Sequence, residues 1–346
     1  MYINFMIWEN KNIYISYWLL LITFLIILII IVGGLTRLTD SGLSITRWDL
    51  FTGILPPLNL EKWKYTFSLY KQTPEFLLIN SSISLKEFQV IYWWEYAHRL
   101  LGRIIGITYL APLIFFSFKF QLNRKKLLNF YLIFVIICFQ GFLGWYMVKS
   151  GLSERVDVSH YRLSMHLTVA FLILIFVFWN YLVYKNENYS IRKNKLPLNL
   201  SLFFVFLVLL QVSIGALVSG LDAGQIYQTW PLMNQSYFPD DSLPSDLLTF
   251  NSFSNPSLVQ FIHRNLAYLI VLVFLIMFYF IFINKKFIHL RKSVLLIFFA
   301  LLFQISLGIL TILSGAYIVT ASLHQIGSIF LVLASIILVY KNNRIN

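Results

Sequence analysis

Eight long apolar runs constrain the fold of this chain more than any other feature of its sequence. A helix needs about 20 apolar residues to cross a hydrocarbon layer of roughly 30 Å. The runs of this length are 15–35, 100–118, 127–148, 163–184, 198–219, 259–283, 293–314 and 319–340. Only 12% of the 346 residues are charged, whereas soluble domains have about 25%. We therefore expect an all-α polytopic membrane protein with eight transmembrane helices.

The net charge of +13 is distributed as membrane topology requires. Lys and Arg cluster in the connections after even-numbered runs, whereas 36–97 balances six bases with six acids and 222–256 has no base. The positive-inside rule then places both termini in the cytoplasm and the loops 36–97 and 220–258 outside. No basic face with interleaved aromatic residues indicates nucleic-acid binding. The first run lacks a cleavage site and is too long for a signal peptide, so we expect a retained span. A bacterial cytoplasmic membrane is favoured over the mitochondrial inner membrane.

The second half of the sequence repeats polar landmarks of the first half. Shared Trp, Asp and His-Arg in the same order are hard to produce by chance. The matches are Gly33, Leu35, Asp40, Gly42 and Trp48 with Gly215, Leu217, Asp222, Gly224 and Trp230, His98-Arg99 with His263-Arg264, Gln140 and Gly144 with Gln304 and Gly308, and His166 with His324. We expect two pseudo-symmetric four-helix bundles in the same orientation, related by an axis along the membrane normal. The expected domains are 1–190 and 191–346.

Four of the six histidines lie at the outer ends of even-numbered spans: His98, His166, His263 and His324. Two imidazoles facing each other across a four-helix bundle can ligate a haem iron from both faces of the macrocycle. A single histidine at a helix end is usually an interfacial side chain. Four histidines that repeat at the same depth of a membrane, where polar side chains are costly, favour iron ligation. We predict the pairs His98 with His166 and His263 with His324.

Arginines near two of these histidines are candidate partners for the haem propionates. Arg99 and Arg264 each follow a histidine directly, and Arg103 lies one helical turn after Arg99. A guanidinium binds a carboxylate through two parallel hydrogen bonds. The alternative is that these side chains extend to the lipid headgroups.

Glu95 breaks the symmetry between the halves, because Gln260 stands at the corresponding position. Glu95 precedes His98 by three residues and shares its helical face if the helix already extends there. A carboxylate beside one haem only predicts chemistry at the first site, either proton acceptance or stabilisation of a cationic intermediate. The alternative is an acid favoured at a helix start by the dipole.

Several segments of the sequence resemble the haem A synthase family. They are 33–44 (GGLTRLTDSGLS), 53–58 (GILPPL), 95–103 (EYAHRLLGR), 161–167 (YRLSMHL) and the contexts of His263-Arg264 and His324-Gln325. The likeness runs from about residue 17 to 340 and is closest to the mitochondrial and proteobacterial branch. The other branch has a cysteine pair in the first outer loop, and this chain has a single cysteine, Cys138, within an apolar run.

The resemblance implies oxidation of a methyl group of haem O to a formyl group, which gives haem A for cytochrome oxidase assembly. It implies a resident haem b held by His263 and His324, and haem O as substrate between His98 and His166, with Glu95 as a further catalytic residue. The implied partners are haem O, the haem O synthase that makes it, and an electron donor or acceptor that is unknown. A homo-oligomer is possible.

Two other classes of protein remain as alternatives. A di-haem b electron carrier would use the same four histidines and would not need Glu95. A transporter would be expected to place its site near the bilayer midplane, whereas these histidines lie near the outer interface.

Overall fold

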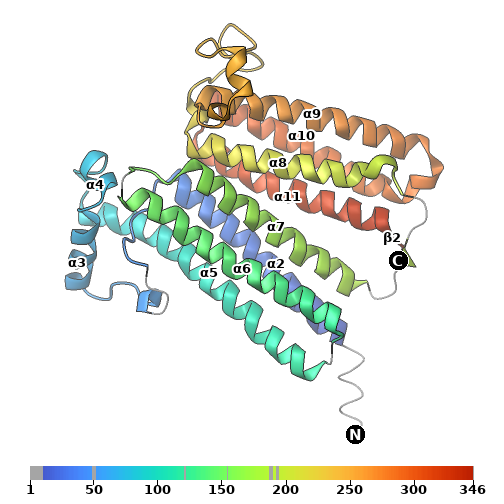
Figure 1. Ribbon diagram of the computed structural model, residues 1–346, viewed down its shortest axis with the longest axis horizontal. Coiled ribbons are helices and arrows are strands. Elements are labelled where there is room, and N and C mark those ends of the chain that lie inside the picture. The colour runs from blue at the N-terminus through green and yellow to red at the C-terminus, as the bar shows by residue number, and fades with distance from the viewer. Residues whose placement is uncertain are drawn as a thin grey trace. The chain divides into compact units, whose positions relative to one another are not determined.

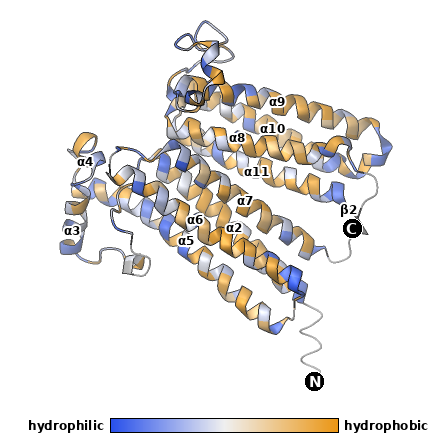
Figure 2. Cartoon of the chain, viewed as in Figure 1, coloured by the Kyte–Doolittle hydropathy of each residue, from blue (hydrophilic) through white to orange (hydrophobic). Residues whose placement is uncertain are grey.

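The computed structural model describes residues 11–48, 52–120, 122–153, 155–186, 190–191 and 195–345. In this part of the chain, eight helices are long and apolar enough to cross a membrane, as the sequence predicts. They are α2 (Lys11–Leu38), α5 (Leu85–Lys119), α6 (Arg124–Ser153), α7 (His160–Lys185), α8 (Leu200–Gly220), α9 (Pro256–Ile283), α10 (Arg291–Leu313) and α11 (Ile318–Asn343) (Figure 1). Apolar residues dominate their length, and hydrophilic residues gather towards their ends and in the connections (Figure 2).

Short elements form the connections between the long helices. The α-helices are α3 (Leu60–Tyr70) and α4 (Pro74–Leu78), and the 3-10 helices are η1 (Thr52–Ile54), η2 (Pro197–Asn199), η3 (Ala223–Gln225), η4 (Pro244–Leu248), η5 (Phe250–Phe253) and η6 (Lys285–Leu290). The strands β1 (Ser190–Ile191) and β2 (Arg344–Ile345) pair antiparallel. Two basic residues of the connection after α7, Arg192 and Lys193, lie outside the described residues.

The chain divides into two compact units, Leu21–Ile173 and Leu174–Asn346 with Met1–Leu20. The first unit packs α2 from Leu21 onward, α5, α6 and the beginning of α7, and the second packs α8 to α11 with the first part of α2 and the end of α7. The predicted domain boundary at 190 and 191 stays a prediction, and so does a pseudo-symmetry axis between the halves.

Helix α5 begins at Leu85, well before the predicted start of its span at residue 100. A capping box explains the early start, because the Ser84 hydroxyl accepts from the Glu87 backbone N–H and the Glu87 carboxylate accepts from the Ser84 N–H. Both bonds satisfy backbone donors that a helix leaves open at its first turn. Glu95 and His98 therefore lie on one continuous helix, three residues apart.

An aromatic cluster holds this outer part of α5 against the first loop. Trp63, Phe67 and Tyr70 from α3 are buried against Phe88 and Tyr92 of α5. The ring centres of Trp63 and Tyr92 are 4.9 Å apart, as are those of Phe67 and Phe88. Buried aromatic pairs at such distances stabilise a fold beyond the area that they bury. The loop is thus a packed layer that supports α5.

The chain leaves α2 and α8 through the same backbone conformation. Asp40 follows α2 with φ of 48° and Asp222 follows α8 with φ of 49°. Asp tolerates the left-handed region better than most residues because its short polar side chain can bond locally. Both aspartates belong to the sequence repeat, so the repeat marks the point where each helix ends and its outer loop begins.

Glu75 on α4 is buried in the first outer loop and makes that loop sensitive to pH. Its side chain is 5% exposed, and burial raises the pKa of its carboxyl to about 8, against an opposing hydrogen bond from Tyr70. The folded loop therefore keeps a proton that the unfolded chain releases near pH 4.5, so loop stability is greatest in acid and falls as pH rises to about 8. Above pH 8 the free energy of folding is less favourable by up to about 5 kcal/mol than in acid.

We predict that Glu75→Gln removes this loss, because a neutral amide has no proton to release. The measurement is amide-exchange protection of residues 60–78 at pH 5.5 and 8.5, corrected for intrinsic rates. Wild-type protection should fall between the two values, and the variant's should not. Glu61→Gln, on an exposed residue of α3, is the matched control. Equal pH dependence in wild type and Glu75→Gln would contradict the assignment.

Candidate functional sites: two histidine pairs

The four predicted histidines meet in two pairs. The ring centres of His98 on α5 and His166 on α7 are 6.4 Å apart, with 68° between their planes. Those of His263 on α9 and His324 on α11 are also 6.4 Å apart, with 75° between their planes. All four rings are half-buried. Each compact unit thus contains one pair, formed by the residues that the sequence pairs.

This spacing fits an iron atom between two imidazoles. A metal–imidazole bond is about 2 Å long, and an imidazole centre lies about 1.1 Å from each ring nitrogen, given C–N bonds of about 1.33 Å. Two imidazoles on opposite faces of one haem iron therefore have centres about 6.3 Å apart. Aromatic rings that merely touch also have centres roughly 4.5–7 Å apart. The surroundings of the rings therefore distinguish iron ligation from ordinary ring packing.

A glycine of a neighbouring helix packs against each of the four rings. A Cβ added at these glycines would meet the imidazole Cε1 at 2.7 Å for Gly33 and His98, 3.1 Å for Gly144 and His166, 3.1 Å for Gly215 and His263, and 3.0 Å for Gly308 and His324. Real Cβ atoms essentially never lie as close to a neighbour as the one at Gly33 would, and the other three distances are tighter than nine in ten real Cβ contacts. A side chain at Gly33 would therefore displace the His98 ring, and one at the other three glycines would crowd its ring.

A glutamine holds three of the four histidines from the helix that carries the glycine. The amide of Gln140 donates to the backbone carbonyl of His166 at 2.9 Å. Gln211 and Gln304 make the same bond to His263 and His324, each at 3.0 Å. The sequence analysis matched Gln140 with Gln304 but did not identify Gln211. The signal that would have found it is the spacing Gln-x-x-x-Gly, which recurs on α6, α8 and α10.

Because the histidines lie in pairs, each site offers two imidazole ligands, which limits the kind of metal group that it can bind. Among the described residues, no group of three or more His, Cys, Asp or Glu side chains could hold a bare metal ion. A macrocycle that already supplies four nitrogen ligands needs only two axial imidazoles. The residues present therefore fit haem.

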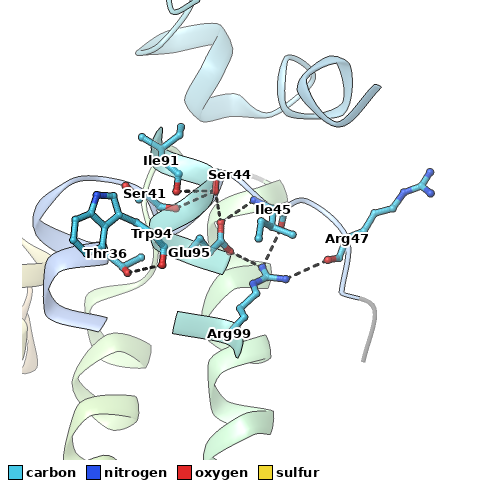
Figure 3. Close-up of polar contacts among 9 residues, drawn as sticks. All are labelled: Thr36, Ser41, Ser44, Ile45, Arg47, Ile91, Trp94, Glu95 and Arg99. Carbon is cyan, nitrogen blue, oxygen red and sulfur yellow. Dashed lines mark hydrogen bonds and ion pairs between the residues drawn. The ribbon is translucent and has the colours of Figure 1, made fainter. Parts of the chain in front are cut away.

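Glu95 is the centre of a polar network that ties α5 to the start of the first outer loop (Figure 3). Its carboxylate is 3% exposed. One oxygen accepts from Arg99 Nη2 at 2.6 Å, and the other accepts from the Ser44 hydroxyl and the Ile45 N–H, each at 2.7 Å. Such charge-assisted bonds are the strongest type for a carboxylate. Sequence reasoning missed Ser44 and Ile45, because a hydroxyl and a backbone N–H more than 40 residues away leave no local signal.

The second unit builds the same junction without a carboxylate. Gln260 donates to the carbonyl of Tyr227 at 3.1 Å, and Arg264 donates to the same carbonyl at 3.0 Å. In the first unit Arg99 donates to the carbonyl of Ile45 at 2.9 Å, and Ile45 is the repeat counterpart of Tyr227. The junction can therefore form with a neutral residue, so its existence does not explain why the first unit has an acid.

The three candidate arginines differ in their surroundings. Arg99 bonds the carbonyls of Ile45 and Arg47, pairs with Glu95, and lies over the ring of Trp48. Arg264 is buried, and its Nε has no hydrogen-bond partner among the described residues. Arg103 is half-buried, one turn along α5 from Arg99. A propionate role stays a prediction for all three.

Comparison with known proteins places the chain in a family. Residues 16–336 match the COX15-CtaA family of cytochrome oxidase assembly proteins. The haem A synthase of Pelagibacter ubique (strain HTCC1062) is 49% identical over 337 residues, which is 97% of this chain and 98% of the relative. The haem A synthase of Rickettsia bellii (strain RML369-C) is 41% identical over 319 residues, 91% of this chain and 94% of the relative. That of Rickettsia felis is 39% identical over 322 residues, 92% of this chain and 94% of the relative.

The lone cysteine agrees with the branch that the motifs indicate, since Cys138 is exposed on α6 and unpaired. With a match over nearly all of its length and eight candidate membrane spans, the chain is a multi-pass membrane protein that belongs to the haem A synthase family.

Proposed function

We propose that this chain is a haem A synthase, which oxidises a methyl group of haem O to a formyl group. Two histidine pairs at 6.4 Å, each ring set against a glycine, carry the proposal. The family supplies the reaction, and the pairs supply places for two haem groups. Haem bound at these sites supplies the redox chemistry, and the chain binds, orients and handles protons.

The two sites have different roles in this proposal. His98 and His166 take haem O as substrate, and His263 and His324 hold a resident haem b. Glu95 supports this division, because it lies on the helix of His98 and its counterpart Gln260 is neutral. A reaction that removes hydrogen from a methyl group releases protons, so the substrate site is the one that benefits from a carboxylate.

Glu95 acts as the proton acceptor or as the stabiliser of positive charge at the methyl carbon. Arg99 pairs with one oxygen of its carboxylate at 2.6 Å, so the two side chains are held together on α5. Ser44 and the Ile45 N–H fix its orientation.

The arginines and the topology complete the proposal. Arg99, Arg103 and Arg264 lie near their histidines in sequence and bind haem propionates. The charge pattern of the connections supports both termini on the inner side, and the bacterial relatives support a bacterial cytoplasmic membrane. Haem O then enters from the bilayer, and the haem O synthase is the partner expected to supply it.

The function is tested by expressing the chain in a bacterium that lacks its own haem A synthase and makes haem O. Haems extracted from the membranes are then separated by chromatography. We expect haem A to appear. Membranes that contain the folded chain with haem b and haem O only would overturn the proposal and leave the electron carrier.

The role of Glu95 is tested by Glu95→Gln, which reproduces the neutral junction that Gln260 forms in the second unit. We expect the visible spectrum of bound haem to stay unchanged, because the loop keeps a hydrogen-bonding anchor. Haem A formation should fall about 100-fold, the typical effect of losing a general base. The measurements are the spectrum of the purified protein and the extracted haem A.

Gln260→Glu is the matched control, since it adds a carboxylate at the second site and should leave haem A formation dependent on Glu95. Normal haem A in Glu95→Gln would show that the carboxylate has no catalytic part. A loss of bound haem together with activity would show that Glu95 serves only to hold the loop.

The glycine contacts generate a further prediction for the substrate site. In Gly33→Ala the new methyl would lie 2.7 Å from Cε1 of His98, so the ring must move away from the iron position. We expect haem at the first site to be lost or to become high-spin, as seen in the visible spectrum. Gly106→Ala on α5 is the control, because a Cβ there meets nothing within 4 Å. Equal spectra for the two variants would contradict the assigned ring position.

A further inference from the structure

The four histidine sites share one layout, and one of them departs from it. Each ring packs against a glycine, and the residue one helical turn before that glycine faces the same histidine. This residue is Gln140 on α6, Gln211 on α8 and Gln304 on α10, but Ile29 on α2. His98 is therefore the one histidine of the four that no glutamine holds.

The three glutamines restrain both the backbone and the ring of their histidines. Besides the bond to the histidine carbonyl, each amide nitrogen lies near a ring nitrogen, at 3.5 Å for His166, 3.2 Å for His263 and 3.2 Å for His324. In a membrane interior, hydrogen bonds between helices fix their relative position. The bond from a glutamine to the histidine carbonyl therefore anchors the backbone that carries the imidazole to the neighbouring helix.

Ile29 cannot restrain His98 in this way. Its side chain ends in a methyl group that packs towards Gly102 of α5, 3.7 Å from where a Cβ would lie. The polar contact that α2 offers to the His98 ring is the backbone carbonyl of Ile29. That carbonyl is a hydrogen-bond acceptor for the ring, and it cannot donate to the His98 carbonyl as a glutamine amide does, so position 29 gives His98 one polar contact where each glutamine gives its histidine two.

The first site thus pairs one restrained ligand with one that lacks the glutamine, whereas both ligands of the second site are restrained. We propose that Ile29 is a positioning residue that makes His98 the releasable iron ligand of the four. His166 would then hold the substrate haem while His98 releases it, and both histidines of the second site would hold the resident haem. This inference rests on the proposed function, because it assumes that the four histidines ligate two haems.

The test is Ile29→Gln in the full-length protein, purified in detergent and loaded with haem b. Release from each site is followed by transfer to excess apomyoglobin, and the spin state is read from the visible spectrum. We expect two release phases in wild type, with the fast one assigned by its loss in His98→Ala. Ile29→Gln should slow that phase about three- to tenfold and raise the low-spin fraction, as one added interhelical hydrogen bond implies.

Gln211→Ile is the reciprocal variant, and it should speed release from the second site by a similar factor. Phe24→Gln is the control for placing an amide in α2, because Phe24 is exposed on the same helix, and its two phases should match wild type. These readouts report ligand release, so they do not depend on turnover.

A fast phase unchanged in Ile29→Gln, or a slow phase unchanged in Gln211→Ile, would overturn the inference. If Ile29→Gln does not fold, the test uses Gln211→Ile and Gln140→Ile. Haem release rates equal to wild type in both variants would reject the inference. Two haems bound with equal release rates would reject the inference and leave the proposed function intact. A wild-type protein that takes up no haem would overturn both.

Discussion

The contact between an imidazole and a bare glycine backbone is the constraint on which the rest of the structure depends. Each of the four rings occupies space that a single methyl group would fill. This close approach brings the two helices of each hairpin together and sets how far each ring reaches into its unit. The two rings of each unit then stop 6.4 Å apart, a separation that suits one iron. The same packing therefore serves helix association and ligand placement.

The two units differ at a few positions, and the proposed division into a substrate site and a resident haem site rests on them. The junction between loop and helix is built on Glu95 and Arg99 in one unit and on Gln260 and Arg264 in the other. The residue one helical turn before the glycine that packs on the histidine is Ile29 in the first unit and Gln211 in the second. Both departures fall on the site of His98. A charged group and a less restrained ligand at one site, against neutral and restrained groups at the other, support the proposal that the first site takes the substrate and the second holds a resident haem.

Much of this could be predicted from the sequence, and the failures have physical causes. Hydropathy predicts the eight spans because lipid leaves few alternatives to helices. The pairing of His98 with His166 follows from two such histidines in one four-helix unit at the same membrane depth, because they can face each other across its core. The start of α5 at Leu85 was missed because the capping box and the aromatic cluster, rather than apolar length, extend that helix. Ser44 and Ile45 were missed because their bonds to Glu95 join distant segments. Ile29 leaves no signal within an apolar run, and only its position opposite His98 gives it meaning.

The proposed function requires that the paired imidazoles bind iron. Low-temperature electron paramagnetic resonance of the purified wild-type protein, with both sites loaded and oxidised, tests this directly. The account predicts two low-spin ferric signals typical of axial imidazole pairs, one lost in His166→Ala and the other in His324→Ala. High-spin signals from both sites, or low-spin signals that survive both substitutions, would contradict it.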